Sequence, residues 1–358
     1  MVPYFTEKWA NPSSLYRTAA DVSRAIQDSR DAISNSLNGT GEGVIFTSGA
    51  TESINSAIHS ATLRFPRKKH ILTSSVEHSA TLAYCDFLER FHGYEVTRLS
   101  VDSVGNIDLR ELEGAIRPET ALVTLIWANN ETGVIWPMEE VAVICRDKCV
   151  MLHVDAVQAV GKIPVDFRAL GADFVSFSGH KIGCPKGIGG LLLAEPEKFH
   201  PLLYGGKQEF GLRGGTENTA QIVGLAKAME ISRSKEALDQ WNAISALREQ
   251  FEARIRTDLY GAAIHGGSSK RLPNTTSVYL PGIDADAAVT YLDQKGICVS
   301  SGSACMESAI APSHVIYAMT GSHDVASETL RISLGRNSTK DELDLLLSEL
   351  VNLTEIYS

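Results

Sequence analysis

The sequence has no long apolar run, no excess of basic residues and no recognisable cysteine pattern. Its longest apolar stretches are only as long as a β-strand, so it predicts no membrane-spanning helix. The formal net charge is -10 at pH 7, which argues against direct nucleic-acid binding because that needs a basic face. The six cysteines have neither zinc-ligand spacing nor the pairing of a disulfide framework.

A secretion signal is also lacking. Residues 1–8 do not follow the basic-then-apolar order of such a signal, so we expect a cytoplasmic protein with reduced thiols. What remains is an ordinary globular composition, with 44% apolar and 21% charged residues in 358 positions. That length suits two coupled domains.

Strand-like and helix-like segments alternate through the first two thirds of the chain, which is typical of an α/β sheet covered by helices. The predicted strands are short apolar runs at 44–46, 71–73, 95–101, 121–128, 150–156, 173–178 and 189–194. The sequence therefore predicts a large domain with a mainly parallel seven-stranded sheet.

The pattern changes after a long helix predicted from 219 to beyond 254, with a bend near 232. Strands at 276–280, 297–300 and 330–334 and helices at 285–295 and 340–356 then predict a smaller α+β domain. We place the large domain at 1–238 and the small domain at 239–358.

Lys181 follows an apolar run and small polar residues, Phe174-Val175-Ser176-Phe177-Ser178-Gly179-His180. A lysine at the inner end of a buried strand can become a nucleophilic amine. The simpler interpretation is a lysine that extends its ammonium group to solvent at a strand end.

Two other strand ends carry polar groups that would meet Lys181 at one edge of the sheet. Ser48-Gly49-Ala50-Thr51 is typical of an anion site at a helix start, or of a plain helix cap, and it lacks the dinucleotide glycines and the P-loop lysine. Asp155 ends a buried strand and needs a cationic partner. A phosphate cradle that includes Ser178, a carboxylate for a pyridinium nitrogen and an imine-forming lysine together favour pyridoxal phosphate. His153 and Asp155 could share a metal, but no third ligand is evident, so no metal site is predicted.

The C-terminal part supplies a thiol and a guanidinium group. Cys305 lies among small polar residues, Ser300-Ser301-Gly302-Ser303-Ala304, where we expect a mobile, exposed thiol, whereas the other cysteines are expected to be buried packing residues. Arg331 lies in a predicted strand and suits either a substrate carboxylate or an interdomain ion pair.

These motifs together resemble the cysteine desulfurases of the NifS/IscS type, class-V aminotransferases with the fold-type-I pyridoxal-phosphate architecture. The resemblance covers nearly the whole chain, including Phe46–Ser53, Glu77-His78, Asn129–Gly133, His153–Gln158, Ser176–Lys181, Gly211–Asn218, Ser300–Cys305 and Arg331–Arg336. Relatives usually begin with a further N-terminal strand, so we expect the wall that this strand supplies to be absent. The residues after Cys305 also differ from the usual pattern.

The resemblance implies roles for single residues. Lys181 would hold the cofactor covalently, Asp155 would pair with its ring nitrogen, and Gln158 would bind its phenolic oxygen. His78 would stack on the ring and assist proton transfer. The remaining implied roles are phosphate binding by Thr51, Ser178, His180 and, across a homodimer, Thr216, and substrate-carboxylate binding by Asn130 and Arg331.

The implied reaction converts L-cysteine to L-alanine and leaves the sulfur on Cys305 as a persulfide. An acceptor protein would then take the sulfur, most commonly for iron–sulfur cluster assembly. The alternatives are sulfur donation for tRNA thiolation or DNA sulfur modification, a selenocysteine lyase, an aminotransferase or other fold-type-I enzyme, and a non-catalytic scaffold.

Overall fold

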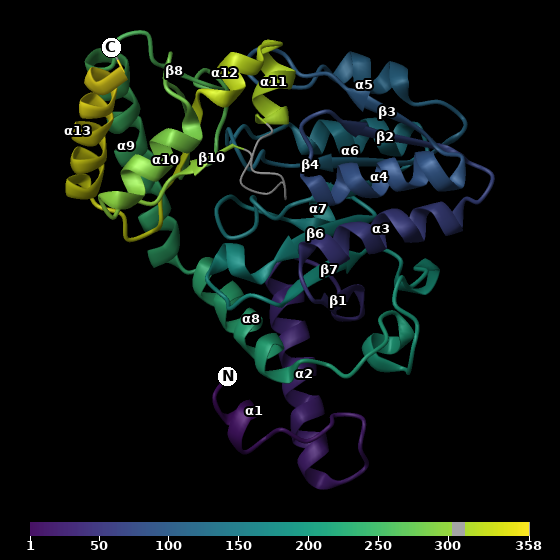
Figure 1. The fold of residues 1–358 in the computed structure, drawn as a ribbon. Helices are drawn as coiled ribbons and strands as arrows, with labels where there is room; N and C mark the ends of the chain where they lie inside the picture. The colour runs from purple at the N-terminus through teal and green to yellow at the C-terminus, as the bar shows by residue number, and fades with distance from the viewer. Residues whose placement is uncertain (303–311, 358) are drawn as a thin grey trace.

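The computed structural model describes residues 1–302 and 312–357. Figure 1 shows a large sheet with its helices on one side of the molecule and the helices α9, α10 and α13 gathered on the other. Helices α1 and α2 extend away from the sheet at the N-terminal end. Within the described residues, no helix is long and apolar enough to cross a membrane.

The large sheet has seven strands in the order β1-β7-β6-β5-β4-β2-β3. Their bounds are β1 Val44–Thr47, β2 His70–Ser74, β3 Glu95–Leu99, β4 Thr120–Ile126, β5 Met151–Asp155, β6 Phe174–Ser178 and β7 Gly189–Leu193. Strand β7 runs antiparallel to both of its neighbours, and all other pairs are parallel. The predicted mainly parallel seven-stranded sheet is confirmed.

Alternate residues of these strands enter two different cores. Ile71 and Leu122 pack into one cluster of buried residues, whereas their neighbours Leu72 and Val123 pack into another. Because side chains alternate between the two faces of a strand, both faces of the sheet are buried. This explains why the strands are continuous apolar runs.

Helices cover the two faces. Helices α3 (Ala50–Arg64) and α4 (Ser79–His92) supply one core. The helices that supply or adjoin the other core are α2 (Arg17–Ser36), α5 (Leu109–Ala115), α6 (Met138–Asp147), α7 (Phe167–Leu170) and α8 (Thr219–Ser232). Short helical segments lie at α1 (Pro3–Thr6), η1 (Gly41–Gly43), η2 (Gly179–Ile182), η3 (Pro196–Lys198) and η4 (Gln208–Gly211).

The C-terminal part builds a third core on a four-stranded sheet in the order β10-β11-β9-β8. Its strands are β8 (Ala263–Ile264), β9 (Thr275–Tyr279), β10 (Ser300–Ser301) and β11 (Thr329–Ser333). Its helices are α9 (Lys235–Asp258), α10 (Ala285–Gln294) and α13 (Lys340–Tyr357), and α11 (His314–Thr320) and α12 (His323–Ser327) lie nearer the large sheet. The α+β character of this part is as predicted, and the boundary at 238/239 remains a prediction.

Two local predictions are wrong. The single helix expected from 219 is two helices, because Ser234 has extended backbone angles (φ -63°, ψ 152°) and its side chain accepts a hydrogen bond from the Ala237 N–H at 3.1 Å. That arrangement is a helix N-cap, which starts α9 anew. The strand expected at 297–300 is reduced to Ser300–Ser301, the residues that pair with β11.

Candidate active site

A cavity of about 650 Å³ lies where the carboxyl ends of the large-sheet strands face the small domain. It is lined by nine of the predicted site residues, namely Thr51, His78, Asn130, Asp155, Gln158, Ser178, His180, Lys181 and Arg331. Eight of these follow or end strands β1, β2, β4, β5 and β6, and Arg331 comes from β11. The parallel order brings those strand ends to one edge, as expected of open α/β sheets.

Lys181 lies just beyond the end of β6, in the short helix η2. Lys181 is exposed and lines the open cavity, rather than being buried in the sheet. The amine can therefore reach a bound molecule while β6 and the αL residue Gly183 (φ +90°) fix its backbone.

Asp155 is the last residue of β5 and is 2% exposed. Burial raises the pKa of this carboxyl to about 6, although the Val157 N–H, 2.9 Å from Oδ1, and the charge of Lys181 oppose that shift. Such a carboxylate favours a cation that enters the cavity.

His153 does not form a metal site with Asp155. Its Nδ1 lies 2.7 Å from the Thr124 hydroxyl and its Nε2 lies 2.8 Å from the Ser176 hydroxyl, so both ring nitrogens are engaged. Within residues 1–302 and 312–357, no group of three or more His, Cys, Asp or Glu side chains could hold a metal ion.

His78 is the N-cap of α4, and this role fixes its tautomer. Its Nδ1 accepts a hydrogen bond from the Ala80 N–H at 3.1 Å. Burial lowers the pKa of His78, and the charges of Lys181 and His314 lower it further. The ring is therefore neutral with its proton on Nε2, available to a group in the cavity.

The groups that could bind a phosphate lie at the start of α3 and at the end of β6. Ser48 to Thr51 line the cavity at the α3 N-terminus, and among the described residues no side chain caps this helix. Ser178 Oγ and His180 Nδ1 are 2.9 Å apart. Free helix N–H groups with nearby hydroxyls form a setting that favours an anion.

Asn130 and Arg331 bring the two domains together at the cavity. Arg331 Nη1 donates to the Asn130 backbone oxygen at 3.4 Å, and Asn130 Oδ1 is buried without a hydrogen-bond partner among the described residues. The neighbouring Glu131 accepts a hydrogen bond from Ser313 Oγ, and burial raises the pKa of its carboxyl to about 7. The charge of Arg331 opposes this rise, and both interpretations of Arg331, a contact to a substrate carboxylate or an interdomain ion pair, remain predictions.

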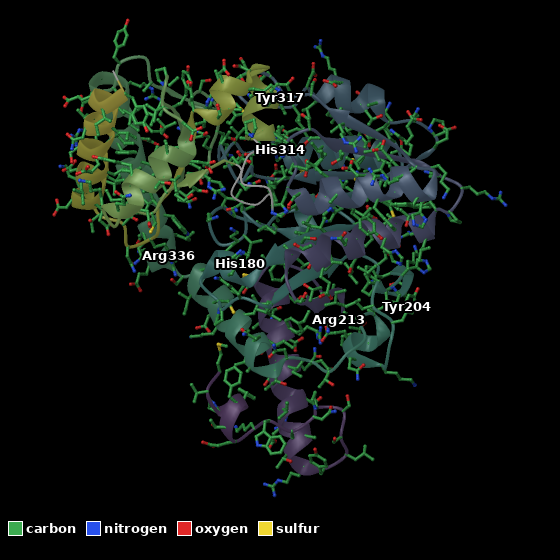
Figure 2. The ribbon with its side chains drawn as sticks, viewed as in Figure 1. His180, Tyr204, Arg213, His314, Tyr317 and Arg336 are labelled. Carbon is green, nitrogen blue, oxygen red and sulfur yellow. The ribbon has the colours of Figure 1, made fainter. Side chains whose placement is uncertain are left out.

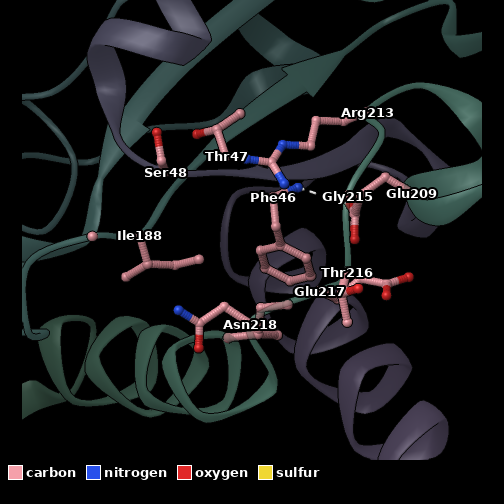
Figure 3. A pocket seen from close by; sticks show the side chains of 12 residues that line it. Phe46, Thr47, Ser48, Ile188, Glu209, Arg213, Gly215, Thr216, Glu217 and Asn218 are labelled. Carbon is pink, nitrogen blue, oxygen red and sulfur yellow. Dashed lines mark hydrogen bonds between the residues drawn. The ribbon is translucent and has the colours of Figure 1, made fainter. Parts of the chain in front are cut away.

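Thr216 lies outside this cavity. It lines a separate pocket of about 190 Å³ with Arg213, Glu209 and Asn218 (Figure 3). Ser48 and Gly187 line both pockets, so the two are neighbours. Figure 2 shows Arg213 and Tyr204 on the segment before α8, well apart from His314 and Tyr317 on α11.

Cys305 lies outside the described residues. Among the other cysteines, Cys85, Cys145 and Cys184 are buried as predicted, but Cys149 and Cys298 are exposed, so that prediction is wrong for these two. Cys149 follows the last turn of α6 with a positive φ of 52°, and Cys298 precedes β10, so neither is on a core-facing position of a helix or strand.

The family model for aminotransferase class-V matches residues 1–346. Cysteine desulfurase 2 of Trichormus variabilis is 41% identical over 355 residues, which cover 99% of this chain and 88% of the relative. Cysteine desulfurase NifS of Azotobacter vinelandii is 40% identical over 351 residues, which cover 98% of this chain and 87% of the relative. The chain belongs to the class-V aminotransferases, among the cysteine desulfurases of the NifS/IscS type.

Solved structures support the same family. A NifS-like protein superposes with a TM-score of 0.91 at 34% identity and covers 99% of this chain and 94% of its own. SspA in complex with cysteine gives a TM-score of 0.81 at 35% identity, with 94% of both chains covered. This class-V aminotransferase is accordingly a pyridoxal-phosphate-dependent enzyme.

The cavity fits that cofactor on its own evidence. The Val157 N–H donates to buried Asp155, and the α3 N-terminus, Ser178 and Lys181 line the same cavity. A pyridinium nitrogen, a phosphate and an aldehyde carbon would each meet a matching group.

Two residues that line the cavity, Lys162 and Trp241, were not predicted from the sequence. The spacing of Gln158 and Lys162, four residues apart, was an available signal for the lysine. Trp241 lies on α9, and no local pattern indicates that this helix passes the cavity.

Proposed function

We propose that this chain converts L-cysteine to L-alanine and transfers the sulfur to Cys305 as a persulfide. The observation that carries the proposal is one cavity that joins an exposed lysine, a buried strand-end carboxylate and an arginine from the small domain. When bound, pyridoxal phosphate supplies an electron sink beside the substrate α-carbon. No metal is needed.

Residues of this chain bind the cofactor, transfer protons and bind the substrate. Lys181 anchors the cofactor and accepts the α-proton of the substrate, Asp155 keeps the ring nitrogen protonated, and Thr51, Ser178 and His180 hold the phosphate. Arg331 and the side-chain NH₂ group of Asn130 would donate to the substrate carboxylate, because a guanidinium group suits a planar anion.

Sulfur transfer needs a second nucleophile. The Cys305 thiolate attacks the substrate sulfur, the bond between that sulfur and the β-carbon breaks, and an S–S bond forms. The carbon fragment takes up one proton at the β-carbon, which neutral His78 can donate from Nε2, regains at the α-carbon the proton that Lys181 accepted, and leaves as alanine. Gly302, three residues before Cys305 in the sequence, lies against Glu131, the residue that follows Asn130 of the cavity lining.

We also propose a homodimer with shared active sites. Thr216 lines a pocket next to the cofactor cavity but not the cavity itself, which suits a phosphate contact to the neighbouring subunit. The nearby segment exposes Leu203, Tyr204 and Phe210, whose exposed fractions are 41%, 74% and 56%. Apolar side chains that gather on a surface in this way favour a protein partner.

The sulfur on Cys305 then passes to an acceptor protein, and we propose iron–sulfur cluster assembly in the cytoplasm as its use. The net charge of -10 favours delivery to a protein rather than directly to a nucleic acid.

Two variants test the reaction. Cys305→Ser should keep the yellow colour of the bound cofactor but lose sulfide release from L-cysteine by at least about a hundredfold, because the attacking thiolate is gone. Lys181→Ala should lose the visible absorbance of the covalently held cofactor. Full sulfide release by Cys305→Ser, or an unchanged spectrum of Lys181→Ala, would contradict the proposal.

A further inference from the structure

Lys162 makes two hydrogen bonds to Gln158 in the wall of the cavity. Its Nζ lies 2.6 Å from Gln158 Oε1 and 3.3 Å from the backbone oxygen of the same residue. Both residues line the cavity that also holds Lys181. None of the roles given above uses Lys162.

The backbone around Lys162 is fixed from both domains. Gly161 has a φ of +78°, and a Cβ added there would lie 2.7 Å from Ile182 Cγ2, so this close approach requires glycine. Trp241 on α9 donates from Nε1 to the Gly161 backbone oxygen at 2.7 Å. Lys162 is therefore held between the segment after β6 and the helix that leads into the small domain.

The chemistry of an ammonium group decides which way the Gln158 amide points. An ammonium group has three donors and no acceptor, so the Gln158 atom that meets Nζ must be the carbonyl oxygen. The amide NH₂ of Gln158 is then left to donate to another group. Without Lys162, the amide oxygen and nitrogen could exchange places.

We propose that Lys162 is a positioning residue, which orients the Gln158 amide so that its N–H groups meet the phenolic oxygen of the bound cofactor. This inference rests on the proposed function, in which Gln158 contacts that oxygen. Donation to the oxygen and the positive charge of Lys162 both favour the unprotonated form of the lysine–cofactor linkage over its protonated form.

The electrostatic surroundings oppose the charged form of Lys162. Burial lowers the pKa of Lys162 to about 7, and the charge of Lys181 lowers it further. His180 also feels the charges of Lys162, Lys181 and Lys186, and Asp155 is the facing carboxylate. A cation in so unfavourable a place needs a partner, which Gln158 supplies.

The test is a pH titration of the visible absorbance band of the holoenzyme. Lys162→Met keeps the chain length but removes the donor, and it should raise the midpoint by about one pH unit. Lys162→Arg keeps a charged donor and should restore the midpoint to within about a third of a unit. Lys162→Gln replaces the methionine variant if the latter does not retain cofactor.

A second pair of variants distinguishes the orientation of the Gln158 amide from the effect of the Lys162 charge alone. In Gln158→Leu, which has no amide to orient, the further change Lys162→Met should shift the midpoint by less than half as much as it does in the wild type. Equal shifts in both backgrounds, or no shift in the single variant, would overturn the proposal. Failure of the proposed function would look different, since the wild type would then show no visible band that depends on Lys181.

Discussion

Glu77 illustrates how burial controls a single residue beside the active site. Its side chain is fully buried directly before His78, and Ser74 Oγ donates to Oε1 at 2.6 Å. Burial raises the pKa of Glu77 to about 8, and the charge of Asp155 adds to this rise. The folded protein thus keeps a proton near neutral pH that the unfolded chain, with a carboxyl pKa of 4.5, has lost.

This difference makes stability depend on pH with a definite sign. Because the folded state binds the extra proton, the free energy of unfolding falls as pH rises from about 4.5 to about 8 and then levels off. In Glu77→Gln this contribution disappears. Between about pH 6 and 7, urea unfolding should show the wild type losing about 1.4 kcal/mol per pH unit relative to the variant.

A surface carboxylate provides the control for that prediction. Glu113 on α5 has a side chain that is 54% exposed and pairs with Lys148 at 3.1 Å. Glu113→Gln should follow the wild-type pH dependence. Parallel curves for Glu77→Gln and the wild type would show that Glu77 is charged in the folded protein.

At the scale of elements, Glu252 joins helix α9 to the small sheet. Its two carboxylate oxygens accept from Arg271 Nη1 and Nη2 at 2.7 and 2.6 Å, and Oε1 also accepts from Thr276 on β9 at 2.7 Å. The side chains of Glu252 and Arg271 are only 3% and 4% exposed. The pair is thus withdrawn from water, and its hydrogen bonds compensate for the lost hydration.

Glu252→Gln should therefore lower the free energy of unfolding by on the order of 3 kcal/mol, because Arg271 is left buried without a full negative charge. Glu249, one turn earlier on the same helix, is 64% exposed and pairs with Arg248, so Glu249→Gln should cost less than about 0.5 kcal/mol. Thermal unfolding of both variants measures the difference. Similar losses for the two would mean that the buried pair adds nothing specific.

Predictability from sequence also differs among the elements. The strands of the large sheet were predictable because each is a short apolar run, and Asp155 and Ser178 were identified because they end such runs. Helix α2 was not predicted although its buried residues Val22, Ile26 and Ile33 recur at helical spacing, which was an available signal. The strand β8 has only two residues and is defined by its pairing with β9, so it carries no such signal. The break at Ser234 depends on one side-chain cap within an otherwise helical pattern.

The site was predictable only in part for a related reason. Arg331 was recognised as a candidate, but its approach to Asn130 depends on how two separate cores lie against each other. Lys162 and Trp241 were missed because their importance comes from contacts across the cavity wall. Local pattern determines which strand ends are polar, and tertiary packing determines which of them meet.

At the scale of the whole molecule, the shared-site dimer makes a prediction that one subunit alone does not. Leu203→Asp combined with Tyr204→Asp should yield monomers in sedimentation velocity, because charges replace exposed apolar groups at the proposed interface. The monomers should also bind pyridoxal phosphate at least about tenfold more weakly, since each site loses a phosphate contact worth roughly 1.5 kcal/mol.

Tyr260 supplies the matched control, because it is fully exposed on the small domain just after α9. Tyr260→Asp should leave both the dimer and cofactor affinity unchanged. If the Leu203/Tyr204 variant stays dimeric, the dimer interface lies elsewhere on the protein. If the variant is a monomer with unchanged cofactor affinity, Thr216 does not contact the phosphate.

Helix α9 connects the cavity wall to the small domain, so ligand binding in the cavity should affect residues far from it. It is 24 residues, or about 36 Å, long, touches the cavity wall through Trp241 and ends beneath β8. A ligand that orders the wall should therefore slow amide hydrogen exchange not only at Gly161 but along this helix into the small domain. The amide exchange rates along α9 would therefore report whether the cavity is occupied, although most residues of this helix do not contact the cavity.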